Sequence, residues 1–161
     1  PCPVIEGDMV VCMSGYQGSS VMAVPLSATG DISGSDAIVW KGERGTPYVP
    51  SPVLYDGLLF FNQSNQAIWT CLDSRTGETV LERTRLPEIS NIYASPVAAA
   101  GRVYVTGRSG TTIVLKRART VQLLATNRLA ERVNSSPALA GTELFIRGAK
   151  SVYCIAEGAK R

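Results

Sequence analysis

The residue types that could do chemistry in this chain are few, because its 161 residues contain no histidine. Histidine is the commonest general base and metal ligand, so Ser-His-Asp and Cys-His nucleophiles are excluded. A Ser-Lys pair stays open, although no motif points to one. Asp31, Asp36, Asp56 and Asp73 fall in or beside predicted turns, where carboxylates usually cap backbone N–H groups or face solvent. We therefore predict no catalytic residue and no metal ligand.

The four cysteines do not form a metal or redox motif. They are Cys2, Cys12, Cys71 and Cys154, and no two have CxxC spacing, which excludes a zinc knuckle or a thioredoxin-type site. Cys71 and Cys154 lie within apolar runs, so both are expected to be buried free thiols. Cys2 and Cys12 could face each other across a hairpin, and both a disulfide and two free thiols are compatible with the sequence.

Two further features could belong to ligand sites, but each has a structural explanation. Trp69 could stack on a planar cofactor, yet it lies in the apolar run 67–72, so we expect it to pack in the core or between sheets. Segments 15–18 and 107–110 are flanked by glycines. They lie between predicted strands rather than before a helix, so they are turns and not phosphate loops.

The elements that must position any site come from an internal repeat. A short strand, a Gly-containing turn and a second strand follow Pro3, Pro52, Pro96 and Pro137, which are 49, 44 and 41 residues apart. This is the pattern of a β-hairpin. Each hairpin is followed by a third apolar run, and three of the four units have a fourth run. The third runs are 20–24, 67–72, 112–115 and 151–155, and the fourth runs are 37–40, 79–82 and 121–124.

Four-stranded antiparallel units at a period of about 40–50 residues are typical of β-propeller blades. The sequence therefore predicts an all-β propeller in one domain, 1–161, with approximate blades 1–41, 42–86, 87–129 and 130–161. The last blade is predicted to lack its outer strand. About four blades make half of an eight-bladed ring. Either a homodimer closes this ring, or the missing half belongs to a longer parent chain.

Charge is distributed unevenly along the chain. The net charge of +3 is too small to imply nucleic-acid binding. Residues 1–40 hold four acids and no Lys or Arg, whereas residues 101–161 hold eleven bases and three acids. A solvated face explains this asymmetry, and it also favours head-to-tail contact between an acidic and a basic end. No run of 18 apolar residues occurs, so no membrane span is predicted.

The candidate ligand-binding residues lie in the segments that lead into the innermost strands, because such segments line the rim of a propeller's central channel. Here these are segments 47–50, 90–94 and 132–135. Loop packing is the alternative explanation for their composition. Their polar and aromatic candidates for ligand contact are Tyr48, Asn91, Tyr93, Arg132 and Asn134.

Segment 72–78, Leu-Asp-Ser-Arg-Thr-Gly-Glu, resembles the L-D-x-x-T-G turn of PQQ-like (pyrroloquinoline-quinone-like) propeller repeats. The Trp that usually follows four residues after this Gly is replaced by Leu81, whereas the first unit keeps Trp40. A Trp at this place would pack flat between blades. The turn also has a physical reading, because Asp73 can accept backbone N–H bonds, Thr76 can support it and Gly77 can adopt a positive φ.

The resemblance implies a bacterial propeller of unassigned role, with periplasmic or secreted location favoured. Quinoprotein dehydrogenases of this fold hold PQQ at the centre of an eight-bladed ring, with calcium, a catalytic Asp and often two adjacent cysteines. This chain has no adjacent cysteines, and none of its acids matches that catalytic position. A quinoprotein dehydrogenase with PQQ and calcium as cofactors is therefore the alternative interpretation. We expect a non-catalytic binding or scaffold module with a protein, peptide or saccharide ligand at the channel mouth.

Overall fold

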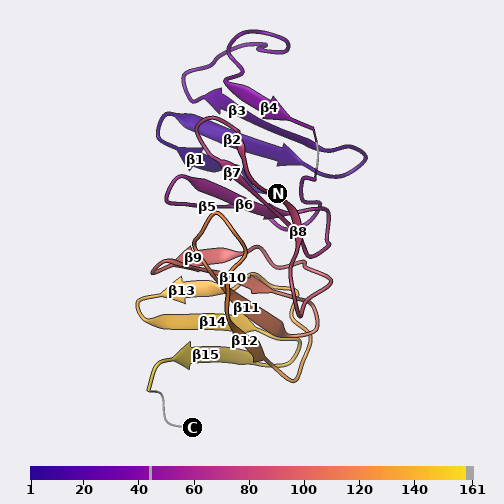
Figure 1. Cartoon of the computed structure of the whole chain (residues 1–161), viewed down its shortest axis with the longest axis vertical. Coiled ribbons are helices and arrows are strands. Elements are labelled where there is room, and N and C mark those ends of the chain that lie inside the picture. Colours follow the sequence, from indigo (N-terminus) through magenta and orange to yellow (C-terminus); the bar gives the residue numbers. More distant parts are fainter. Residues whose placement is uncertain (44, 159–161) are drawn as a thin grey trace.

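The computed structural model describes residues 1–43 and 45–158. The chain forms four antiparallel sheets that follow one another along the long axis of the molecule (Figure 1). Each sheet uses consecutive strands, so the order of strands in the sheet equals their order in the chain. The predicted all-β propeller architecture of about four blades is confirmed. The described blades form an open row and do not close into a ring.

Each blade begins with a three-residue strand, and the strands of a blade pair as a meander. Blade one contains β1 (Val4–Glu6), β2 (Met9–Ser14), β3 (Ser20–Pro25) and β4 (Trp40–Gly42). Blade two contains β5 (Val53–Tyr55), β6 (Leu58–Asn62), β7 (Ile68–Asp73) and β8 (Thr79–Arg85). Blade three contains β9 (Val97–Ala99), β10 (Arg102–Thr106), β11 (Thr111–Lys116) and β12 (Leu123–Arg128). Blade four contains β13 (Ala138–Ala140), β14 (Glu143–Arg147) and β15 (Val152–Ala156).

Two of the predicted fourth strands begin later than the sequence suggested. The run 37–40 is wrong by three residues, since β4 begins at Trp40. A turn in which the Ile38 N–H donates to the Ser35 carbonyl (3.4 Å) occupies the preceding residues. The run 121–124 becomes β12, which begins at Leu123 and extends to Arg128. Apolar residues in these outer strands therefore mark the strands without fixing their limits.

The core lies between neighbouring blades, because each inner sheet packs on both of its faces. The side chains of β6 are all buried, and Leu59 and Phe61 face blade one while Leu58 and Phe60 face blade three. Burying one such side chain fully contributes about 1.5–3 kcal/mol. In β14, by contrast, Ile146 is buried against blade three, but the residues on the other face are exposed or half-buried. Packing therefore stops at the outer face of blade four.

Both ends of the row present an uncovered sheet face. On blade one, the strand register places Ile5 on the face turned away from blade two, and its side chain is 62% exposed. On blade four, the register places Val152 on the face turned away from blade three, and it is 71% exposed. The apolar residues that share these faces are Val10, Cys12, Met22 and Val24 on blade one, and Phe145 and Cys154 on blade four.

A ladder of hydrogen bonds joins the first strands of the four blades. The Cys2 N–H donates to Ser51 Oγ (2.8 Å), the Ser51 N–H to Ser95 Oγ (2.9 Å), and the Ser95 N–H to Ser136 Oγ (2.9 Å). Each of these residues directly precedes one of the four repeated prolines. The repeated Ser-Pro pair therefore does two things. Serine links one blade to the next, and proline starts a strand without needing a ladder partner for its nitrogen.

The turn between β7 and β8 has the predicted structure and carries an inter-blade contact. Asp73 Oδ1 accepts the N–H groups of Arg75 and Thr76, both at 3.0 Å, and Gly77 has a φ of 72°. These hydrogen bonds hold the pKa of Asp73 below its ordinary value, the bond from the Thr76 N–H being the strongest cause. Trp40 of blade one lies on this turn, and its Nε1–H donates to the Ser74 carbonyl (3.2 Å).

The cysteines differ from expectation at two positions. Cys71 is fully buried as predicted, and burial raises the pKa of its thiol to about 12. Cys154 is exposed, because it lies on the uncovered face of blade four, so its predicted burial is wrong. Cys2 and Cys12 are free thiols. Val4 pairs with Val11 in this hairpin, so Cys12 lies opposite Pro3 rather than Cys2, and a disulfide across the hairpin is not formed.

Replacement of Gly77 by alanine tests the contact between Trp40 and the β7–β8 turn. A Cβ added at Gly77 would lie 2.6 Å from Trp40 Cδ2, whereas a Cβ at Gly30, with the same φ of 72°, meets no atom within 4 Å. Both Gly30→Ala and Gly77→Ala pay about 1–2 kcal/mol for the positive φ. We expect Gly77→Ala to lose about 1–3 kcal/mol more through overpacking. Urea unfolding measures both variants, and equal losses would contradict the contact.

Candidate functional site

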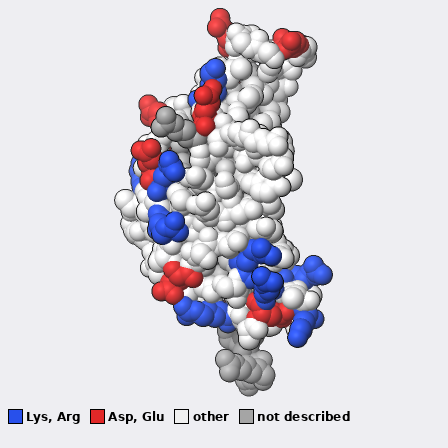
Figure 2. All heavy atoms as spheres, turned by 90° about the vertical axis from the view of Figure 1, so that its right-hand side faces the viewer, with Lys and Arg blue, Asp and Glu red and all other residues white. Residues whose placement is uncertain are grey.

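The three candidate segments lie along one edge of the row of blades, together with the turns between second and third strands. In blades two, three and four, the segment that leads into the blade and the turn between its second and third strands share a backbone hydrogen bond. The Tyr48 N–H donates to the Ser64 carbonyl (3.1 Å), the Arg108 N–H to the Asn91 carbonyl (2.8 Å), and the Ala149 N–H to the Arg132 carbonyl (3.0 Å). We call this edge the rim face, defined by segments 47–50, 90–94 and 132–135 and turns 15–18, 63–67, 107–110 and 148–151. These turns lie on the right of Figure 1, which is the side that faces the viewer in Figure 2.

Charged side chains are unevenly spread over the rim face. In Figure 2, Lys and Arg side chains gather at the lower end, over the C-terminal blades, and few charged side chains lie over the centre. The basic residues of blades three and four therefore give this end of the face a local positive character. That character agrees with the eleven bases and three acids in residues 101–161. An anionic ligand group would be attracted to this end.

Tyr93 and Asn134 come together through a residue that the sequence analysis did not select, Arg108. The Arg108 guanidinium carbon lies 4.2 Å from the centre of the Tyr93 ring, in a cation–π contact. Its Nε donates to Asn134 Oδ1 at 2.9 Å. Arg108 follows Gly107 in the turn between β10 and β11, where a Cβ on that glycine would lie 3.1 Å from Ile89. Three segments distant in sequence thus converge on one guanidinium.

The other three candidates lie on the rim face outside the side-chain cluster of Tyr93, Arg108 and Asn134. Tyr48 stacks on Tyr16 of the β2–β3 turn, with ring centres 5.0 Å apart. Asn91 and Arg132 are exposed, and the contacts described above use their backbone carbonyls, not their side chains. Tyr16 and Arg108 occupy matching places, each directly after the first glycine of a Gly-flanked turn. That shared place was the available sequence signal for Arg108.

Glu131 holds the blade-four end of the rim face together. Its carboxylate accepts the Tyr153 hydroxyl (2.5 Å) and the Lys150 N–H (2.6 Å). Both bonds hold the pKa of Glu131 below its ordinary value, the Tyr153 hydroxyl being the stronger cause. The same bond raises the pKa of the Tyr153 phenol. A Cβ at Gly148 would lie 2.3 Å from the Glu131 carboxyl carbon, so an alanine in this place of the β14–β15 turn would displace the Glu131 side chain.

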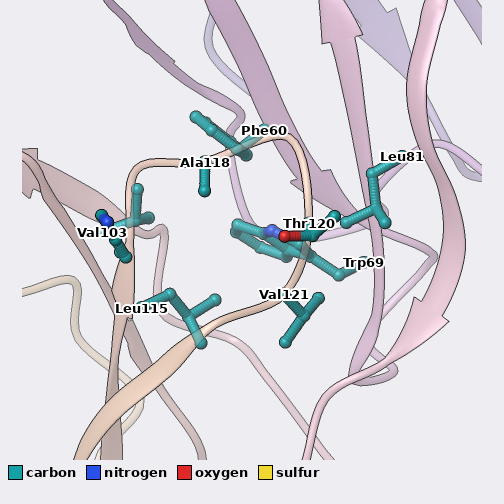
Figure 3. A pocket seen from close by; sticks show the side chains of 9 residues that line it. Phe60, Trp69, Leu81, Val103, Leu115, Ala118, Thr120 and Val121 are labelled. Carbon is teal, nitrogen blue, oxygen red and sulfur yellow. The ribbon is translucent and has the colours of Figure 1, made fainter.

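Trp69 packs in the core, as the sequence favoured. It is 1% exposed and stacks on Phe60, with ring centres 6.0 Å apart. Residues Ala118, Thr120 and Val121 of the β11–β12 loop close over it (Figure 3). The cavity that remains beside the ring is about 10 Å³, room for one water at most. The Trp69 ring is therefore a packing residue between blades two and three.

The aspartates singled out from the sequence lie in turns. Asp31 Oδ1 accepts the Ser33 N–H (2.9 Å), which lowers the Asp31 pKa, and Asp56 forms an ion pair with Arg117 (3.0 Å). Asp36 also lies in a turn. Within residues 1–43 and 45–158, no three His, Cys, Asp or Glu side chains are placed to hold one metal ion. The same residues contain no helix long and apolar enough to cross a membrane.

Comparison with known proteins defines the class of fold. No protein-family model matches the chain, and no curated protein sequence matches it either. Among solved structures, the computationally designed propeller Ika4 superposes with a TM-score of 0.70 at 12% identity, over 97% of this chain and 89% of Ika4. The designed Ika8 protein gives a TM-score of 0.65 at 14% identity, over 95% of this chain and 45% of Ika8.

A natural protein, BamB from Moraxella catarrhalis, is also similar, with a TM-score of 0.47 at 13% identity over 93% of this chain and 56% of BamB. The two designed proteins are similar in fold alone, because their identities are so low. The chain is thus a β-propeller module. It spans most of one designed propeller and less than half of the other.

The low pKa of Glu131 predicts how stability depends on pH. A carboxylate whose pKa is lowered by folding stabilises the folded state above its unfolded pKa, about 4.3, and this stabilisation is lost as pH falls through the folded pKa. We expect Glu131→Gln to unfold at lower urea than wild type at pH 7, with the difference shrinking below about pH 4. The exposed Glu78→Gln is the control and should show no such trend. A pH-independent loss in Glu131→Gln would contradict the role of its charge.

Proposed function

We propose that the chain is a non-catalytic β-propeller module that binds a protein or peptide through the rim face. The observation that carries this proposal is the convergence of Tyr93, Arg108 and Asn134 from three segments of the chain. Such a cluster orders a guanidinium at the surface, where loop packing alone does not need one. The exposed side chains of Asn91 and Arg132 lie on the same face and add donors and acceptors.

We also propose that two copies form a homodimer that closes an eight-bladed ring. Each chain has one uncovered face on blade one and one on blade four, with Ile5 62% exposed and Val152 71% exposed. A propeller blade is stabilised by neighbours on both faces, so exposed apolar faces favour association. A two-fold axis would place blade four of each chain beside blade one of the other, and would cover both kinds of face at once.

Charge and the serine ladder support a second copy as the occupant of these faces. Residues 1–40 carry four acids and no bases, whereas residues 101–161 carry a large basic excess, so the two meeting ends attract each other. The ladder stops with the Ser136 N–H at one end and the Cys2 side chain at the other. In a closed ring these two groups would face each other at the place that serine Oγ fills in the inner steps.

We also propose that the blades of this chain are repeats of the PQQ-like type. It is supported by the hydrogen bonds of Asp73 and the positive φ of Gly77 in the β7–β8 turn, which match the turn that the resemblance concerns. Trp40 packing on that turn adds to the support. These features are structural, so they support the type of repeat and do not support the binding of a cofactor.

A binding screen tests the proposed function. Sets of synthetic peptides and of oligosaccharides are presented to the immobilised chain, and any ligand is measured again with Tyr48→Ala and Asn91→Ala. Removing a contact residue should weaken binding about tenfold. Gln122→Ala is the matched control, because it lies in the loop at the end of β11 that is distant from the rim face. Binding that only the control variant weakens would contradict the rim face as the binding site.

A further inference from the structure

Arg108 is held in a way that leaves its charge available. Its Nε is taken by Asn134 Oδ1 (2.9 Å), and the Tyr93 ring lies against the guanidinium plane (4.2 Å). Neither partner is an acid. Within the described part of the chain, only Arg75, Arg117 and Arg128 pair with an acid, so Arg108 shares the absence of a counter-ion with other arginines; it differs in that Tyr93 and Asn134 hold its side chain in place. The two terminal nitrogens, Nη1 and Nη2, therefore form an ordered fork without a counter-ion.

The surroundings of Arg108 strengthen the interaction that its guanidinium can make with an anion. Arg108 is half-buried, so a charge pair formed there is screened less than one in open solvent. Glu131 directly precedes rim segment 132–135, and its carboxylate is occupied by the Tyr153 hydroxyl and the Lys150 N–H. Arg132 and Lys150 lie in rim segment 132–135 and rim turn 148–151 of blade four, and they add positive charge at this end of the face. A planar fork of donors fits a carboxylate in bidentate geometry.

We propose that Arg108 anchors the carboxylate of an acidic peptide on the rim face; this inference rests on the proposed binding function. A peptide fits better than an acidic saccharide, because sugars bind on open aromatic faces and the Tyr93 face is already covered by the guanidinium. Tyr48 and Tyr16 stack on each other and stay 43% and 63% exposed, but they belong to the segment that leads into blade two and to the turn of blade one, not to the Arg108 cluster. The side chains of Asn91 and Asn134 offer amide groups beside the anchor, which can pair with a peptide backbone.

The experiment measures fluorescence anisotropy of a labelled peptide rich in Asp and Glu, beside the same peptide with Asn and Gln at those places. We expect the acidic peptide to bind at least tenfold more tightly. Arg108→Gln should abolish this preference. Arg108→Lys, which keeps the charge but loses the fork, should retain only part of it. Lys116→Gln is the matched control, since it removes one positive charge at the opposite end of β11 from the rim turn.

The outcomes separate this inference from the broader proposal. Equal losses in Arg108→Gln and Lys116→Gln would show general electrostatic attraction and overturn the anchor. Loss of peptide binding in Asn91→Ala but not in Arg108→Gln would keep the rim face and overturn the anchor alone. Tighter, Arg108-dependent binding of an oligomeric uronate would assign the site to a saccharide and overturn the peptide. If Arg108→Gln fails to fold, Arg108→Lys against Lys116→Gln tests the anchor instead, because lysine keeps the charge and loses only the fork; an unchanged preference in Arg108→Lys would overturn the anchor.

Discussion

One hydrogen bond between each pair of neighbouring blades, from a backbone N–H to a serine Oγ of the next blade, sets the spacing on which this structure depends. The three bonds from Cys2, Ser51 and Ser95 span 49, 44 and 41 residues of chain, which are the same intervals as those of the repeated prolines. They fix where each innermost strand begins. Once these starts are aligned, the apolar faces of neighbouring blades meet, and the segments before the prolines are brought to a common edge.

The same spacing explains how a site arises from residues that are distant in sequence. The segment before Ser95 carries Tyr93, and the segment before Ser136 carries Asn134, so the ladder holds both in fixed relation to the intervening β10–β11 turn. Arg108 in that turn then lies between them. Blade packing by Trp69, Phe60 and their neighbours makes the arrangement rigid. The rim cluster is thus a consequence of the repeat rather than of a local motif.

The sequence predicted the fold well, and it marked only part of the side-chain cluster that forms the candidate site. The repeat period, the positions of the repeated prolines and the apolar runs together predict the four blades. They do so because every blade makes the same contacts with its neighbours. Tyr93 and Asn134 could be selected because they precede inner strands. The only sequence signal for Arg108 is its place after Gly107 in a Gly-flanked turn, because its role depends on contacts with side chains from two distant connections. The prediction that Cys154 is buried is wrong for a related reason. An apolar run predicts a strand, but burial requires a neighbouring blade, and blade four has none on that face.

The central claim is that the two uncovered end faces meet in a second copy, and the solution mass tests it most directly. Sedimentation equilibrium at low salt should give twice the chain mass of 17.2 kDa. Reversing the exposed charges of blade four, in Arg147→Glu with Lys150→Glu, should shift the mass toward one chain, whereas Arg85→Glu with Lys116→Glu on the inner blades should not. A mass of 17.2 kDa for the unaltered chain would contradict the closed eight-bladed dimer.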